Sequence, residues 1–132
     1  MKHFLLLVFF ASMGALAILS CSKDKTYQVR YTVQRTIPSA DTNNYLVTFY
    51  NQVSKVAQDT CYNGRWSFEF MADAAQFIYV SVFPPDTVTD LTVSIIVDGA
   101  VFKTLTGKGF INPKYNRIAD GITIFGATPE SD

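Results

Sequence analysis

Apolar and polar residues alternate along most of this chain from about residue 26 onward, which is the period of a β-strand with one buried face. The clearest run is 27–34, in which Tyr and Val residues alternate with Gln, Arg and Thr. Similar runs occupy 45–50, 66–70, 91–97, 100–106 and 118–125, with a shorter candidate at 53–56. Residues 77–83 are almost continuously apolar, which predicts a central strand covered on both faces.

Turn-forming residues separate these runs. Asn63-Gly64 and Asp98-Gly99 predict tight turns, because these residue types adopt positive φ at low cost. Residues 38–44 and 107–116 are rich in Pro, Gly, Asn and Lys and predict loops, and Pro84 ends the apolar run before it.

About seven short strands with no convincing helix predict an all-β fold, a single antiparallel β-sandwich with an Ig-like layout. Residues 71–76 leave room for one helical turn at most. The alternation places four aromatic side chains in the core: Trp66, Phe68, Tyr79 and Phe83.

The first 20 residues have the layout of a secretory signal peptide. Lys2 and His3 form a short positive start, and residues 4–19 are apolar. The sequence Ile-Leu-Ser-Cys at 18–21 resembles a lipobox, the recognition site of lipoprotein signal peptidase, and Cys21 is then the residue that carries lipid. The chain accordingly divides into a signal peptide (1–20), a lipidated tether (21–25), a β-sandwich domain (26–126) and a polar tail (127–132).

Residues 15–17 leave an alternative open, since Ala-Leu-Ala also fits an ordinary signal-peptidase site. Cleavage there would leave Cys21 free to pair with Cys61. If Cys21 is lipidated instead, Cys61 has no partner and is either a small buried apolar residue or a loop thiol. An Asp directly after the lipidated Cys favours retention of a lipoprotein at the inner membrane, and this chain has Ser22 at that position. The sequence therefore favours an outer-membrane anchor, on the periplasmic face or the cell surface.

The fragments at 29–33, 66–70, 77–81 and 91–99 are together similar to the periplasmic domain of MmpS-type membrane proteins. They also resemble Bacteroidetes-type lipoproteins with a small β-sandwich domain, over most of residues 27–124. MmpS-type proteins are accessory factors of lipid and siderophore exporters, anchored by an N-terminal helix where this chain has a lipobox. The resemblance implies a sandwich and an accessory role, and it supplies no catalytic motif.

The composition indicates little chemistry. Lys and Arg (11) balance Asp and Glu (11), so no basic surface for nucleic acid is expected. His3 is the only histidine and lies in the leader, which removes the usual general base. Cys61 alone cannot form a zinc site. Asp86, Asp90 and Asp98 fit turn chemistry better than a catalytic or calcium site. We therefore expect no catalytic residue, no metal and no cofactor.

Phe110 and Tyr115, flanked by Lys108, Lys114 and Arg117, are the best candidates for a contact surface, because they fall in a predicted loop. The alternative is that both rings fold back as a lid on the sandwich. These features predict a non-catalytic lipoprotein, attached to the membrane through Cys21, that acts as an accessory or binding subunit beside an envelope protein. The second hypothesis is a surface module that binds a glycan or a small hydrophobic ligand.

Overall fold

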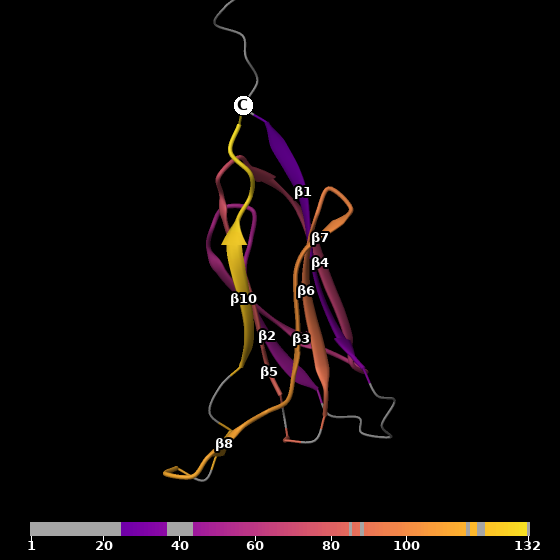
Figure 1. The fold of residues 1–132 in the computed structure, drawn as a ribbon, viewed down its shortest axis with the longest axis vertical. Helices are drawn as coiled ribbons and strands as arrows, with labels where there is room; N and C mark the ends of the chain where they lie inside the picture. Colours follow the sequence, from indigo (N-terminus) through magenta and orange to yellow (C-terminus); the bar gives the residue numbers. More distant parts are fainter. Residues whose placement is uncertain are drawn as a thin grey trace, which may run out of the picture.

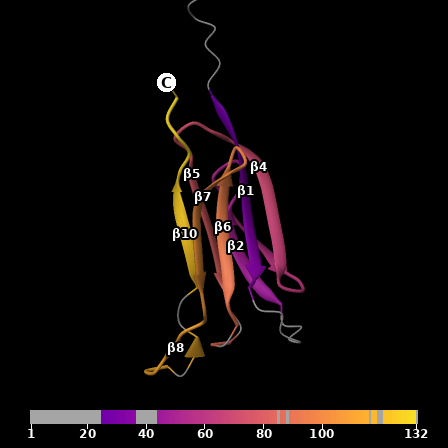
Figure 2. The ribbon, with the colours of Figure 1, turned by 45° about the vertical axis from the view of Figure 1, so that its right-hand side comes forward.

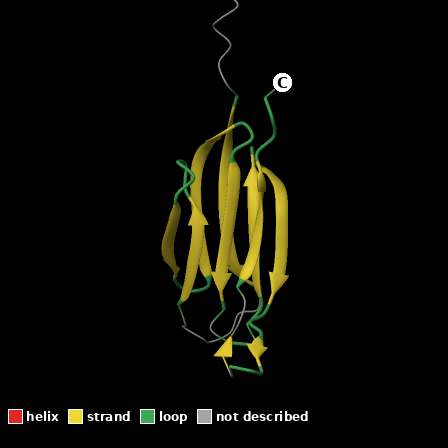
Figure 3. Ribbon diagram, turned by 90° about the vertical axis from the view of Figure 1, so that its left-hand side faces the viewer, coloured by secondary structure: helices red, strands yellow, loops and turns green. Residues whose placement is uncertain are grey.

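The computed structural model describes residues 25–36, 44–84, 86–87, 89–115, 117–118 and 121–131. The regular structure in this part of the chain consists of strands, and it contains no helix (Figure 3). The strands are β1 (Thr26–Arg35), β2 (Tyr45–Tyr50), β3 (Val56–Cys61), β4 (Arg65–Asp73), β5 (Phe77–Phe83), β6 (Leu91–Val97), β7 (Ala100–Gly107), β8 (Ile111–Asn112), β9 (Arg117–Ile118) and β10 (Ile122–Ala127).

Eight of these strands form two antiparallel sheets that face each other, which confirms the predicted β-sandwich (Figure 1). Sheet A has the order β4-β1-β6-β7, and sheet B has the order β10-β5-β2-β3. The pairs β1–β4, β2–β5 and β5–β10 match the B–E, C–F and F–G pairs of an immunoglobulin sandwich. Strands β6 and β7 occupy the other side of β1, and β8 and β9 form a separate short hairpin.

Inward-facing side chains of both sheets form one core. They are Val29, Tyr31, Val33, Tyr45, Val47, Phe49, Cys61, Phe70, Ala72, Ile78, Val80, Val82, Leu91, Val93, Ile95, Ile122 and Ile124.

Both predicted turns are present, since Asn63 and Gly64 have φ of 56° and 70° and Asp98 and Gly99 have φ of 49° and 80°. These positive angles match the right-handed twist of the strands that the turns connect.

The prediction for the core was right in β4 and wrong in β5. Trp66 and Phe68 are half-buried and pack against the core, as expected. Tyr79 and Phe83 instead point away from it, because Ile78, Val80 and Val82 take the buried positions of β5. The strand is central, but only one of its faces is covered. Both alternating sets in this strand are largely apolar, so periodicity alone could not show which set faces inward.

Three boundaries also differ from the prediction. The candidate strand at 53–56 is mostly a turn, in which Asn51 accepts hydrogen bonds from the backbone N–H groups of Val53 and Lys55 (both 3.1 Å), and β3 begins only at Val56. Residues 71–73 extend β4 rather than forming a helical turn. The predicted run 118–125 is divided between β9 and β10, and the predicted loop at 107–116 contains β8.

The two ends of the described domain lie together, and the β8–β9 hairpin lies at the opposite end of the long axis (Figures 1 and 2). Backbone hydrogen bonds fix this arrangement: Ala74 donates to Lys25 O (3.1 Å), and Thr128 donates to Gln76 O (2.9 Å). Thr128 is buried, although it belongs to the predicted polar tail. A chain anchored near residue 21 would therefore hold the hairpin at its far end.

Candidate binding surfaces

The hairpin end carries the contact residues predicted from the sequence. Phe110 is 61% exposed and Tyr115 is 56% exposed, so neither ring is a lid on the core. Lys114 Nζ lies 5.3 Å from the centroid of the Tyr115 ring, a cation–π contact that brings these two residues together. Lys108 is directed elsewhere, because its Nζ lies 3.7 Å from Asp90 Oδ2. The side chain of Arg117 and the predicted lipidation site, Cys21, lie outside the described residues.

A second candidate surface, which the sequence did not predict, is the outer face of sheet B. Two parallel rows of side chains cross its four strands. The apolar row consists of Phe125, Tyr79, Tyr50 and Val56. The hydroxyl row consists of the hydroxyl residues Thr123, Ser81 and Thr48, and the amide side chain of Gln58 continues it on β3. Register sets the rows: Phe125 pairs with Tyr79, Tyr50 pairs with Val56, and the Tyr50 and Tyr79 rings are 5.4 Å apart.

The rings around the apolar row are tilted against one another. Phe77, at the end of β5, contacts Tyr50 with centroids 5.3 Å apart and planes at 69°, and it contacts Phe125 at 6.0 Å and 42°. Tyr50 and Tyr79 are also inclined by 42°. A flat ligand surface needs coplanar rings to stack on. This contoured cluster instead suits side chains that interdigitate with it.

Charge distinguishes the outer faces of the two sheets. Exposed apolar side chains on sheet B include Val56 (62%), Phe125 (53%) and Phe77 (43%), and no outward-facing residue of its described strands is charged. One cation, Lys103 of β7, lies at the rim beside Phe125, where it donates to Phe125 O (2.6 Å) and so covers the free edge of β10. Sheet A carries charged outward residues, Arg30, Arg65, Glu69 and Asp73. An uncharged, aromatic-rich face in water is typical of an interface.

Tyr31 fixes the backbone beneath the apolar row. Its hydroxyl reaches from β1 across the core, donates to Tyr50 O (2.9 Å) and accepts from the Tyr79 N–H (3.3 Å). The regular pairing of β2 with β5 ends at Phe49 and Val80, so this hydroxyl bridges the two strands just beyond their last paired residues. Burial raises the pKa of Tyr31 to about 12, with a smaller opposing effect of the Tyr79 hydrogen bond, which keeps the phenol protonated.

The hydroxyl row is internally hydrogen-bonded. The Ser81 and Thr123 hydroxyls are 2.7 Å apart, and Gln58 Nε2 donates to Thr48 Oγ1 (3.4 Å). These polar groups already have partners within the face. Covering them therefore costs less than burying unpaired hydroxyls would.

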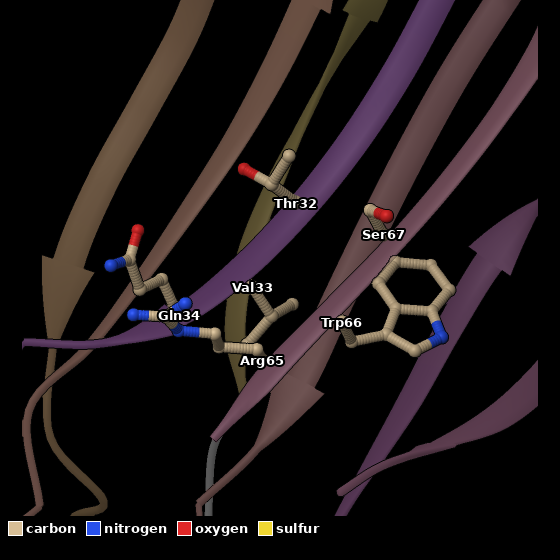
Figure 4. Close-up of a pocket in the computed structure, with 6 residues that line it drawn as sticks. All are labelled: Thr32, Val33, Gln34, Arg65, Trp66 and Ser67. Atoms are coloured by element: carbon tan, nitrogen blue, oxygen red, sulfur yellow. The ribbon is translucent and has the colours of Figure 1, made fainter. Parts of the chain in front are cut away.

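The outer face of sheet A contains a shallow pocket of mixed polarity, of about 410 Å³ (Figure 4). It is lined by Thr32, Val33, Gln34, Arg65, Trp66 and Ser67. The indole of Trp66 points away from the polar residues and donates to Asp59 Oδ2 (2.9 Å), and this bond, followed by one from Thr60 N–H, lowers the pKa of Asp59. The pocket thus has polar groups but no aromatic platform on which a sugar ring could stack.

The remaining candidates for chemistry have structural partners. Asp86 accepts hydrogen bonds from the backbone N–H (2.7 Å) and the hydroxyl (2.9 Å) of Thr89, and Asp98 accepts from Gln28 N–H (2.8 Å). Cys61 is fully buried in β3, and its pKa is raised to about 11, chiefly by desolvation, so the thiol stays neutral. Within the described ranges no cluster of three His, Cys, Asp or Glu could hold a metal ion.

No helix long and apolar enough to cross a membrane occurs among the described residues. Comparisons with family models, curated proteins and solved structures gave no match for this chain.

Proposed function

We propose that this protein is a non-catalytic lipoprotein, anchored to the outer membrane through Cys21, that acts as a binding subunit of a cell-envelope assembly. The observation that carries the proposal is the outer face of sheet B. A solvated antiparallel face normally alternates polar side chains with buried ones. Here the outward positions hold a cluster of four aromatic side chains and no charge, which is the composition of the centre of a protein interface.

The position of the domain ends supports the anchor. The start of β1 and the end of β10 lie at one end of the sandwich (Figure 1), where a short tether from Cys21 would enter. The strands would then stand on the membrane, and sheet B would be accessible from the side. The similarity to MmpS-type proteins and Bacteroidetes-type lipoproteins agrees with an accessory role of this kind.

The test is site-specific photocrosslinking of the full chain in a bacterial envelope. A photoreactive phenylalanine analogue replaces Phe77 on sheet B or, as the control, Thr104 on the outer face of sheet A. We expect a discrete protein adduct from position 77 and none from position 104. Equal adducts from both positions, or none from position 77, would refute the docking face.

A separate measurement tests the anchor. The intact mass of the membrane-extracted protein should correspond to a chain that begins at Cys21 and carries acyl groups. A Cys21→Ala variant should lose the lipid and leave the membrane fraction. A lipid-free chain that begins at residue 18 would contradict the anchor and leave Cys21 available to Cys61.

The β8–β9 hairpin supports a second candidate function, binding of a glycan or a small hydrophobic ligand. This candidate rests on the two exposed rings that flank β8, Phe110 and Tyr115. Strand β8 lies at the end of the sandwich opposite the start of β1 (Figure 1). A printed glycan array and an apolar fluorescent dye would serve as probes. The double substitution Phe110→Ala and Tyr115→Ala should reduce binding at least tenfold without changing the melting temperature. Unchanged binding would eliminate this site.

A further inference from the structure

From the layout of sheet B we infer that the occupant of its outer face is a second copy of this chain. The inference deepens the proposed function and depends on it, since it names the partner of the same face. A two-fold axis that runs along the strands, between β5 and β2, would set β10 of one copy over β3 of the other and β5 over β2. Such contacts use the same patch twice, as in most homodimers.

The sequence of side chains in the two rows fits this axis. The apolar row reads Phe125, Tyr79, Tyr50, Val56 across the sheet, so the rotation places Phe125 over Val56 of the other copy and Tyr79 over Tyr50. The same rotation places the hydroxyl row of one copy over the hydroxyl row of the other. Each member of the apolar row therefore meets an apolar side chain, and each polar side chain of the second row meets a polar side chain that is already hydrogen-bonded.

The absence of charge on the face favours self-association. Identical surfaces bring identical charges together near a two-fold axis, and like charges in an interface oppose binding. The outward positions of the described strands of sheet B carry none. Lys103 lies at the rim, where an interface is polar and solvated.

The direction of the axis follows from the anchor. A two-fold axis along the strands leaves both N-terminal ends on the same side, so two copies can be anchored in one leaflet. An axis across the strands would point the two tethers in opposite directions. The proposed membrane anchor thus selects the first arrangement.

The area of the face places the contact in a size class of protein interfaces. Four strands about 4.8 Å apart and six or seven residues long give a face roughly 19 Å by 20 Å. With its side-chain relief, this face offers on the order of 500 Å² per copy, so the pair buries about 1,000 Å², near the lower limit for a specific interface. We expect a weak dimer in dilute detergent and a stable one in the membrane, where the tether raises the effective concentration.

The test uses paired cysteines in the full lipidated chain in membranes. Val56→Cys with Phe125→Cys places a thiol on β3 of one copy opposite a thiol on β10 of the other, across facing sheets about 10 Å apart. A short bis-maleimide should convert this double variant to a covalent dimer. Each single variant should remain monomeric, because its two identical thiols lie on opposite sides of the axis. The matched control, Ser67→Cys with Thr104→Cys, places thiols on the edge strands of sheet A and should also stay monomeric.

The outcomes separate this inference from the proposed function. A covalent dimer from the sheet B double variant, with none from the sheet A control, supports the inference. Adding Tyr79→Glu to the sheet B double variant should lower the yield of dimer at least fivefold. Equal dimer from both faces, or no dimer from a variant whose melting temperature shows it is folded, overturns the inference. In that case a position 77 photoadduct with the mass of a different protein would leave the proposed function intact, whereas no adduct would remove both.

Discussion

Two buried tyrosines provide a controlled comparison at the scale of single residues. Tyr31 and Tyr45 are 0% and 1% exposed, but only the Tyr31 hydroxyl is hydrogen-bonded, since the Tyr45 hydroxyl has no partner among the described residues. Replacing Tyr31 with Phe removes the hydrogen-bond partner of the partly buried Tyr50 O and Tyr79 N–H and should cost about 2 kcal/mol. Tyr45→Phe should cost little or stabilise the protein. Urea unfolding of both variants measures this, and equal losses would contradict the bridge.

Cys61 makes stability depend on pH at the alkaline end. Its pKa of about 11 in the folded state lies above its ordinary value of 9.0, so the unfolded chain loses the thiol proton first. The stability that the buried, protonated thiol contributes is therefore fully present below pH 9 and is lost between pH 9 and 11. Between pH 8 and pH 10.5 the parent chain should lose about 2 kcal/mol more than Cys61→Ala, by urea unfolding. If the parent chain and Cys61→Ala lose the same stability over this pH range, the pKa of the thiol does not differ between the folded and unfolded states.

The two glycine turns differ in their surroundings, which gives a prediction at the scale of elements. Gly64 and Gly99 both have positive φ, 70° and 80°. A Cβ at Gly64 would lie 2.9 Å from Arg35 Cβ, whereas one at Gly99 would have no neighbour within 4 Å. Gly99→Ala should cost about 1 kcal/mol, from backbone strain alone. Gly64→Ala should cost at least about 1 kcal/mol more. Thermal unfolding with equal losses would mean that Arg35 moves away freely.

The sequence predicts strands well where one face is clearly polar. Alternation located β1 and β6 closely, because their inward Tyr, Val, Leu and Ile residues are separated by Gln, Arg, Thr and Ser. It also located β2, although the outward residues of that strand are Leu46, Thr48 and Tyr50. It missed β3, an edge strand with the sequence VAQDTC, which buries only Cys61 fully. Local sequence carries little signal when a strand is held mainly by hydrogen bonds to one neighbour.

The same limit explains why the outer face of sheet B escaped prediction. The outward set of β5 (Phe77, Tyr79, Ser81 and Phe83) is largely apolar, like the inward set (Ile78, Val80 and Val82), so alternation alone does not show which set is buried. Register with β2 and β10 decides it, and register is a property of the assembled sheet. Phe110 and Tyr115 were found because they lie in a segment rich in turn residues, where exposure follows from the local sequence.

At the scale of the whole molecule, the apolar row should matter for association and little for folding. Phe77 and Phe125 are already 43% and 53% exposed, so replacing both with Lys removes limited burial and should cost less than about 2 kcal/mol in total. Val80, on the same strand as Phe77, is fully buried, and Val80→Ala alone should cost about 2 kcal/mol through the cavity that it leaves.

The two variants should rank the other way in their effect on association between copies. The double Lys variant places like charges within the uncharged face, so crosslinking through sheet B should fall at least tenfold, while Val80→Ala should leave it unchanged. Melting temperature and crosslink yield, measured on the same samples, separate the two effects. If the double Lys variant instead unfolds as readily as a core variant, the aromatic cluster serves to stabilise the sandwich, and its lack of charge would no longer point to a partner.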